Sequence, residues 1–348
     1  MSVYLINTDF EEVLAQETIG SIHEQLQFLP LLYASPADMV AVSFLPPPQE
    51  IQALAKQPWR KGVPLPKLIL QEEIVPFYEK PLVYWGASSP LQQWAKERTM
   101  SVHFPDPNLL ARVCSKAYSF RYSTLPEAAL LFSPADLVVW DRTLSRKKVL
   151  KTCFGYSGKG LHLFETLSKH TWNFCEREWA ALRPVLAEPW LQKTMDLSSQ
   201  WTIHETGSWT LHGITFFTTS SKGVYRSSYT MPESSIHKAM QSFIEEHLIH
   251  CQKVLWDLFA EGYFGPVGCD ALIYRDEEKK LHLYPIVEIN PRETISKATL
   301  LMQQSFFPNL PLHVFSTSAS ALGPTLLPTQ GLHHPFPRKW WYSNKVLW

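Results

Sequence analysis

Two segments near the C-terminal end of the chain carry oxygen-bearing side chains at a spacing that could hold a metal ion. Asp270 lies in GYFGPVGCDALIY, and Glu288 and Asn290 lie in LHLYPIVEINPRET, with a short charged turn between the segments. Side chains two residues apart on a strand share a face, so Glu288 and Asn290 are expected to meet Asp270 across a β-hairpin. Oxygen ligands without His or Cys suit a hard cation such as Mg²⁺. The pattern predicts a divalent cation that bridges nucleotide phosphates.

An ordinary amphipathic hairpin with a solvated turn at residues 276–280 would show the same alternation. The sequence Asn290-Pro291-Arg292 weighs against that alternative, because it puts polar groups where a plain strand would simply turn. On the opposite face, Val287 and Ile289 are expected to turn to the apolar side. Pro285 cannot donate a ladder hydrogen bond, so an edge strand or a bulge is expected there.

A second candidate is the glycine-rich segment KTCFGYSGKG, which runs from Lys151 to Gly160. It matches neither the P-loop pattern GxxxxGK[ST] nor the dinucleotide pattern GxGxxG. Its glycines still predict a flexible hairpin whose backbone amides could close over phosphate oxygens, with Lys151 as a point charge. A surface hairpin without a ligand is the alternative for this segment taken by itself.

Composition limits the class of protein. The chain has 348 residues, enough for two or three subdomains that share a cleft, and Lys plus Arg equals Asp plus Glu at 32 each. Zero net charge gives no general attraction for nucleic acid or an anionic membrane, so neither is expected as a partner. The five cysteines are scattered and contain no CxxC pair, which favours a reducing cytoplasm.

No segment reads as a targeting or membrane-spanning element. The start, MSVYLINTDFEEVLAQ, lacks a basic region and soon carries acidic residues. The most apolar later stretch, residues 128–140, is interrupted by Pro134 and Asp136 and is shorter than the ~20 residues that span a bilayer. A soluble, cytoplasmic protein is therefore expected, and the sequence leaves open whether it forms a homo-oligomer.

Patterns of apolar and turn residues predict a mixed α+β and α/β architecture. A small α/β unit is expected in the first hundred residues, and an antiparallel sheet after residue 200. The tail HHPFPRKWWYSNKVLW could stack on a nucleic acid, but a docked terminal segment is the favoured interpretation. Expected strands cover 68–70, 81–86, 136–140, 148–153, 187–192, 200–206, 209–220 and 223–231, and expected helices cover 91–99, 109–121, 171–186 and 236–260.

Several motifs in order along the chain resemble the ATP-grasp superfamily, over roughly residues 100 to 305. They begin with Lys116, continue through the glycine segment and Glu188-Pro189-Trp190-Leu191, and end with the hairpin and Arg292. The resemblance implies two α+β subdomains that hold ATP between their sheets, with the glycine segment as a mobile lid. It divides the chain into an N-terminal α/β subdomain (1–105), a lid subdomain (106–190), a metal-binding subdomain (191–310) and a tail (311–348).

The resemblance also implies a role for each matching residue. The implied cofactors are ATP and Mg²⁺, with Mn²⁺ as an alternative ion. Glu188 would accept a hydrogen bond from the adenine amino group, the backbone of Trp190 and Leu191 would read the ring edge, and Asp196, with Gln200 as a helper, would bind the ribose. The remaining matches are Lys116 and Lys151 for the phosphates, Gly155, Ser157, Gly158 and Gly160 for the lid, Asp270, Glu288 and Asn290 for the metal, and Arg292 for the transferring phosphoryl group or a substrate carboxylate.

The chain departs from the family pattern just before the metal ligands. Gly268 and Cys269 stand where many family ligases have an arginine, so Lys222, Arg226 or Arg292 would have to supply that charge. The expected activity is ATP-dependent ligation, in which a small or peptide-like carboxylate is activated as an acyl phosphate for an amine or thiol. The alternatives are an ATP-grasp kinase acting on a hydroxyl and a nucleotide-regulated binding protein. A kinase would need a base, and His204 and His212 are more often structural.

Overall fold

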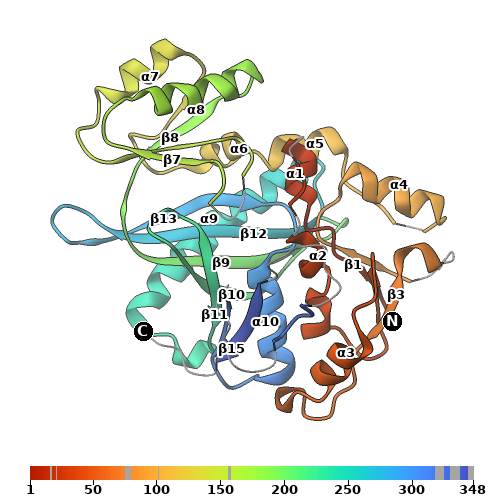
Figure 1. Cartoon of the computed structure of the whole chain (residues 1–348). Helices are drawn as coiled ribbons and strands as arrows, with labels where there is room; N and C mark the ends of the chain where they lie inside the picture. Colours follow the sequence, from red (N-terminus) through yellow and green to blue (C-terminus); the bar gives the residue numbers. More distant parts are fainter. Residues whose placement is uncertain are drawn as a thin grey trace.

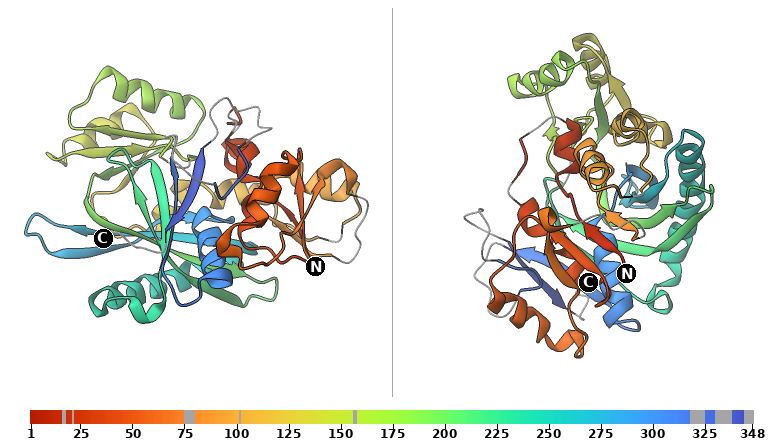
Figure 2. Two further views of the ribbon diagram at one scale, coloured as in Figure 1. Left: turned by 60° about the horizontal axis from the view of Figure 1, so that its bottom comes forward. Right: turned by 90° about the vertical axis from the view of Figure 1, so that its right-hand side faces the viewer.

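Three β-sheets make up the framework of the described part of the protein (Figure 1). One of the two four-stranded sheets, within residues 129–189, is called the small sheet. It projects with its two helices from one end of the molecule (Figures 1 and 2). No helix among the described residues is long and apolar enough to cross a bilayer. The structure, a computed structural model, describes residues 1–15, 18–20, 22–74, 80–100, 102–155, 158–317, 325–329 and 338–343.

The N-terminal unit is a four-stranded parallel sheet in the order β3-β2-β1-β4. Its central strands are short and almost entirely apolar, as expected for strands covered on both faces. The expected strands at 68–70 and 81–86 and the helix at 91–99 are confirmed with small changes of boundary. The elements are β1 (Val3–Leu5), α1 (Phe10–Ala15), α2 (His23–Leu26), β2 (Met39–Val42), α3 (Pro48–Ala55), β3 (Lys67–Leu70), β4 (Leu82–Tyr84) and α4 (Ser89–Glu97).

The small sheet has four antiparallel strands in the order β5-β8-β6-β7, with α7 and α8 beside it (Figure 1). Its apolar core includes Leu137 and Trp140 from α7 and Cys175 from α8. Two short helices connect it to the N-terminal unit. The elements are α5 (Pro107–Val113), α6 (Lys116–Ser119), β5 (Ala129–Leu131), α7 (Pro134–Asp141), β6 (Lys148–Lys151), β7 (Leu161–Phe164), α8 (Lys169–Ala180) and β8 (Val185–Pro189).

The large sheet has seven antiparallel strands in the order β13-β12-β9-β10-β11-β14-β15. Long helix α9 packs on β9, β12 and β13, while α10 packs on β10 and β11. The elements are β9 (Gln192–Ile203), β10 (Trp209–Thr219), β11 (Tyr225–Thr230), α9 (Lys238–Ala260), β12 (Gly265–Arg275), β13 (Leu281–Asn290), α10 (Ile295–Phe306), β14 (Leu312–Thr317) and β15 (Lys339–Ser343).

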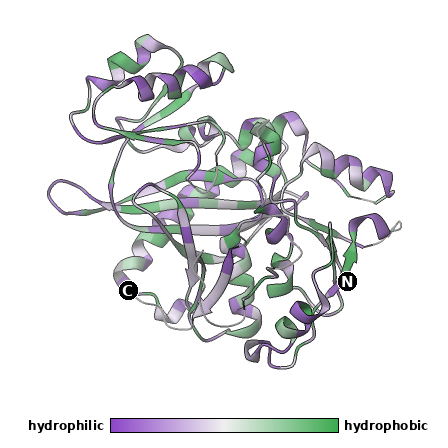
Figure 3. Ribbon diagram, in the orientation of Figure 1, coloured by the Kyte–Doolittle hydropathy of each residue, from purple (hydrophilic) through white to green (hydrophobic). Residues whose placement is uncertain are grey.

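The predicted metal-binding hairpin is present as β12 and β13. Asp270 lies directly opposite Glu288 in the strand register. β13 is the edge strand, and the register shifts after Asp270, so the expected consequence of Pro285 is confirmed. Ile289 is buried in the apolar core, whereas Val287 lines the cavity described below, so the alternation is not strict. The charged turn is hydrophilic and projects from the molecule (Figure 3).

Three predicted elements differ from the structure. The expected strand at 136–140 is helix α7, because the Ser133 side chain caps its first turn and Pro134 opens it. The expected helix at 171–186 ends at Ala180, where Leu182 has a positive φ and Pro184 follows. The expected helix at 109–121 is divided at Ser115, whose side chain caps α6.

The C-terminal segment contributes to the large sheet. β14 pairs with β11, and β15 pairs with β14 along the whole of its length. Trp340 on β15 is almost fully buried. The docked terminal segment is therefore confirmed for Lys339–Ser343, and the remaining residues of the tail lie outside the described part of the chain.

Candidate functional site

One cavity of about 740 Å³ collects side chains from the N-terminal unit, the small sheet and the large sheet. Most of the site residues predicted from the sequence line it, although they come from segments far apart in the chain. Those that do are Lys116, Lys151, Gly155, Gly158, Glu188, Trp190, Leu191, Asp196, Asp270, Glu288, Asn290 and Arg292.

The three predicted metal ligands lie beside one another in the wall of the cavity. The Asn290 amide donates to Oδ2 of Asp270 at 3.1 Å, and the Ser198 hydroxyl donates to Oδ1 of Asp270 at 2.6 Å. The carboxylate of Glu288 accepts from the ammonium of Lys116. The Asn290 amide nitrogen faces Asp270, whereas its oxygen accepts from Arg292, so this amide would have to turn to present its oxygen to a cation.

The charges at this centre would favour a bound cation. Burial and the neighbouring Glu288 carboxylate raise the pKa of Asp270 to about 7. Burial also acts to raise the pKa of Glu288, but the combined attraction of Lys116, Lys151 and Arg292 outweighs it, so this pKa is lowered. No group of three His, Cys, Asp or Glu side chains in the described residues is arranged to hold a metal alone. Two carboxylates and an amide would suit Mg²⁺ that takes its other ligands from phosphates and water.

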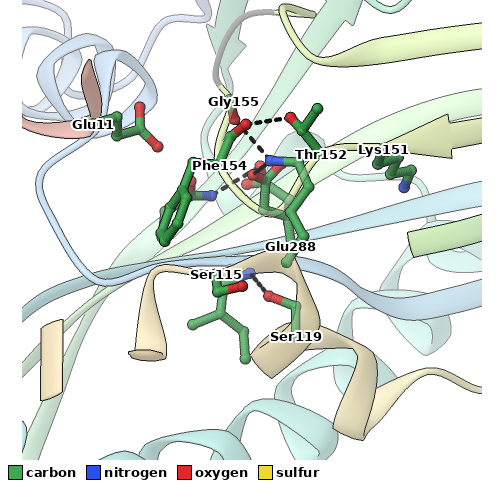
Figure 4. A network of polar contacts seen from close by, with 12 residues as sticks. Glu11, Ser115, Ser119, Lys151, Thr152, Phe154, Gly155 and Glu288 are labelled. Atoms are coloured by element: carbon green, nitrogen blue, oxygen red, sulfur yellow. Dashed lines mark hydrogen bonds and ion pairs between the residues drawn. The ribbon is translucent and has the colours of Figure 1, made fainter. Parts of the chain in front are cut away.

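Lys116 is positioned by the break that separates α5 from α6. Its ammonium also donates to the Gly155 carbonyl at 2.7 Å, so it joins the glycine segment to the hairpin. In Figure 4 Glu288 lies between the Gly155 turn and the Ser115 to Ser119 segment, with Glu11 on one side and Lys151 on the other. The Ser119 hydroxyl accepts from the Ile289 backbone N–H at 3.0 Å and ties α6 to β13.

A second group of contacts lies where the small sheet meets the large one. Lys151 pairs with Oε2 of Glu188 at 2.6 Å, and the Tyr284 hydroxyl donates to Oε1 of Glu188 at 2.8 Å. Both oxygens of the predicted adenine-binding carboxylate therefore have protein partners. The Trp190 N–H donates to the Lys147 carbonyl at 2.8 Å, so that N–H is not available to a ring edge.

Asp196 lies on β9 at the edge of the same cavity. Burial raises its pKa, an effect that the nearby Lys193 opposes. The Lys193 ammonium contacts both the Asp196 carboxylate and the Thr219 hydroxyl, and all three residues line the cavity. Gln200, the suggested helper, instead donates to Ser198 at 2.7 Å and accepts from Thr294 at 2.7 Å, so it contacts the partner of Asp270.

The glycine segment forms another wall of the cavity, beside the β10–β11 hairpin. A Cβ atom added to Gly158 would lie 2.7 Å from the Val224 Cα, at the tip of the β10–β11 hairpin, and Gly158 also has a positive φ of 81°. Only glycine combines that backbone conformation with so close an approach. Gly160 packs on Thr152 beneath the segment and does not line the cavity, and Ser157 lies outside the described residues.

Arg292 lies where the N-terminal unit lines the cavity, a region that we call the N-terminal end of the cavity. Its guanidinium donates to Glu11 at 3.0 Å and to the Asn290 side-chain oxygen at 2.9 Å, and it lies 5.8 Å from the centre of the Trp85 ring. Burial raises the pKa of Glu11, and Arg292 opposes that shift. The pair joins helix α1 to the end of β13.

Two predicted catalytic residues lie outside the cavity. Lys222 is exposed in the turn between β10 and β11, and Arg226 is exposed on β11. Their side chains project into solvent, so the assignment of a catalytic charge to either is not supported. His204 and His212 are hydrogen-bonded to Thr210 and Thr202 on the neighbouring strands and do not line the cavity, which agrees with a structural role.

Sequence reasoning missed several residues that complete the site. Lys193, Ser198 and Tyr284 each contact a predicted residue, and their strand positions were a usable signal: each shares a strand with a predicted residue. Glu11 gave no such signal, because its partner Arg292 is 281 positions away in the chain.

Comparisons with known proteins give the fold. No family model matches the chain, and no curated protein matches it in sequence. Biotin carboxylase from Campylobacter jejuni, solved as a β,γ-ATP complex, has a TM-score of 0.53 at 12% identity, over 93% of this chain and 77% of that one. The biotin carboxylase domain of Hydrogenobacter thermophilus 2-oxoglutarate carboxylase, solved with MgADP, ADP and bicarbonate, has a TM-score of 0.51 at 11% identity, over 91% and 75%.

A third similar structure is pyruvate carboxylase from Rhizobium etli, with a TM-score of 0.53 at 12% identity, over 98% of this chain and 35% of that one. Such low identities show a shared fold and nothing finer. The protein has the ATP-grasp fold, as the order of its motifs predicted.

Proposed function

We propose that this protein is an ATP- and Mg²⁺-dependent, ADP-forming ligase that activates a carboxylate as an acyl phosphate for attack by an amine or thiol. One observation carries the proposal: Lys116, Lys151 and the oxygen-rich centre of Asp270, Glu288 and Asn290 line a single cavity. Structures with the same fold have been solved with MgADP and a β,γ-ATP ligand, which supports a nucleotide in this cavity.

We assign the nucleotide phosphates to the centre of the cavity. Mg²⁺ held by Asp270, Glu288 and Asn290 would neutralise charge on the β- and γ-phosphates. Lys116, which pairs with Glu288, would turn to the phosphates as they bind. We assign the base to Glu188, the Trp190 carbonyl and the Leu191 N–H, and the ribose to Asp196 and Lys193.

We assign the carboxylate substrate to Arg292, because a guanidinium binds a carboxylate with two parallel hydrogen bonds. Glu11 now takes one of those positions at 3.0 Å, so an anionic substrate would exchange with it. The chain's contribution to the reaction is placement and charge stabilisation, and no side chain becomes covalently attached.

Trapping with hydroxylamine tests the reaction class. The protein is incubated with ATP, Mg²⁺, hydroxylamine and a library of small amino and peptide-like acids. An acyl phosphate yields a hydroxamate, with ADP and free phosphate in equal amounts, and Asp270→Asn should abolish all three. Phosphate retained on a substrate hydroxyl without hydroxamate would identify a kinase instead, and ATP binding without turnover of any acid would favour a nucleotide-regulated binding protein.

A further inference from the structure

A chain of three buried side chains, Thr8, His23 and Glu12, reaches the wall of the cavity and has no role in the proposed function so far. The Thr8 hydroxyl lies 2.8 Å from Nδ1 of His23, and Nε2 of His23 lies 2.6 Å from the Glu12 carboxylate. The side chain of His23 is 10% exposed and that of Glu12 is 1% exposed. Thr8 and His23 both line the cavity.

The position of this chain in the fold is one where ligands bind. In the sheet order β3-β2-β1-β4, the chain runs from β1 through β2 to β3 on one side and then crosses to β4 on the other side of β1. The crevice beyond the carboxyl ends of β1 and β4 is therefore the switch point of the parallel sheet. Thr8 follows β1, and Trp85 follows β4. Asn7 joins the two loops, with its amide donating to the Gly86 carbonyl at 2.8 Å and its oxygen accepting from the Trp85 N–H at 3.1 Å.

Hydrogen-bond chemistry gives the chain a direction. A carboxylate can only accept, so Nε2 of His23 carries the proton that faces Glu12. Nδ1 of the neutral ring is then the acceptor, and the Thr8 hydroxyl donates to it. The lone pairs of the Thr8 oxygen are left to accept a hydrogen bond from a group in the cavity.

Carboxylates and a lysine surround the far side of this chain. The Glu12 carboxylate contacts Nε2 of His23 directly, and Asp9, which precedes α1, interacts favourably with His23. The ammonium of Lys159, from the glycine segment, lies 4.0 Å from the same Glu12 oxygen. The glycine segment therefore lies close both to Glu12 and to the β10–β11 hairpin.

We infer that Thr8, His23 and Glu12 form a proton relay that deprotonates an amine acceptor at the N-terminal end of the cavity. This inference rests on the proposed ligase function and narrows its acceptor to an amine. The protonated amine first gives a proton to the Thr8 oxygen as the hydroxyl proton of Thr8 passes to Nδ1 of His23. The neutral nitrogen then forms a bond to the acyl carbon while the bond from that carbon to the phosphate oxygen breaks, and the second proton lost by the nitrogen leaves with inorganic phosphate.

The test compares two nucleophiles on the same activated acid. Hydroxylamine is largely unprotonated near neutral pH and needs little help from a base, whereas ammonia and amino acids are protonated and must lose a proton before they attack. With an acid that gives hydroxamate in the parent, Thr8→Val and His23→Asn should lower amide formation with an ammonia and amino-acid panel by about 100-fold or more. Both variants should still form hydroxamate at a rate of the parent's order, and Thr8→Ser should restore the amide.

Matched controls and the contrary outcomes make the result decisive. Thr210→Val removes the hydroxyl from another Thr–His pair, 2.9 Å from His204 and outside the cavity, and should change neither product. Equal loss of hydroxamate and amide in Thr8→Val, or no loss of either, would refute the relay. If the unmutated protein forms hydroxamate but no amide with any amine, the relay is also refuted. If the unmutated protein forms no hydroxamate, the proposed ligase function itself is contradicted.

Discussion

The hairpin end of the cavity and its N-terminal end contain similar groups but are built in different ways. At the hairpin end, Asp270 and Glu288 face each other on adjacent strands, and the register of a single ladder sets their separation. At the N-terminal end, Thr8, Glu12 and His23 come from a loop and two short helices, and Glu11 meets Arg292 across two structural units. The first arrangement is local and rigid, whereas the second depends on how the units pack.

This difference predicts a division of labour. The hairpin end and the glycine segment should control nucleotide binding and formation of the activated acid, whichever nucleophile is supplied. The N-terminal end should control only what happens to the activated acid. Variants at the hairpin end should therefore lower ADP release, whereas variants at the N-terminal end should change only the product formed from the activated acid.

The largest effect is expected from Glu288→Gln. The amide keeps the shape of the side chain but removes an anionic ligand, so ADP release with an accepted acid should fall at least about 100-fold with every nucleophile. Glu278→Gln, in the exposed turn of the same hairpin, is the control and should be silent. ADP release at the parent rate with a folded Glu288→Gln protein would show that the hairpin does not hold the metal.

A smaller effect is expected from Lys151→Ala. Loss of a charged hydrogen bond to phosphate is worth about 1.5–3 kcal/mol, so calorimetry should show ATP affinity reduced by roughly one to two powers of ten. Removal of Lys151 also leaves the buried Glu188 without its cation, so Lys151→Ala combined with Glu188→Gln should recover thermal stability. Lys147→Ala, an exposed lysine of the same strand region, serves as the control. Unchanged ATP affinity would favour the alternative that the glycine segment is a surface hairpin without a ligand.

Gly158→Ala should weaken ATP binding more modestly. Gly158 and Gly62 both have φ near +80°, so alanine at either costs about 1 kcal/mol of stability. Only at Gly158 would the new methyl group meet the Val224 backbone, whereas nothing lies within 4 Å of it at Gly62. We expect an affinity loss of about fivefold or more for Gly158→Ala and none for Gly62→Ala. Equal affinities in the two variants would separate closure of the glycine segment from nucleotide binding.

The smallest effect concerns a group outside both ends of the cavity. Burial lowers the pKa of His212 to about 4, so the folded protein keeps this ring neutral while the unfolded chain takes up a proton below its ordinary value of 6.5. Stability should therefore fall as pH drops from about 6.5 towards 4. His212→Gln should weaken that dependence without changing ATP affinity. Melting curves at pH 7 and pH 5 for parent and variant measure the difference, and identical slopes would contradict the assignment.

Several features of the site could be predicted because local rules determine them. Period-two alternation placed Glu288 and Asn290 on one strand, and the register with Asp270 followed from the hairpin. The glycines of residues 155–160 predicted that the backbone of this segment could approach another group closely, and Pro285 predicted an edge strand or a bulge. Arg226 and Lys222 are exposed and do not line the cavity. Charge alone does not say which face of a strand or turn meets the cavity.

Errors in the fold have local causes as well. Residues 136–140 are apolar and β-branched enough to resemble a strand, but a serine cap and a proline at the first turn made them a helix. The capping signal was in the sequence and was outweighed there by the apolar run. The split at Ser115 is a second capping signal of the same kind, and it sets the position of Lys116.

The sequence by itself determined most of the strands, the β12–β13 hairpin and each single motif of the predicted nucleotide site, because each depends on residues close to one another in the chain. Only the tertiary structure decided that Glu11 pairs with Arg292, that Tyr284 and Lys151 share Glu188, and that His23 joins Thr8 to Glu12 at the cavity wall. Contacts between units depend on how their apolar faces pack, and packing is set by the shape of the whole core rather than by any short pattern of residues.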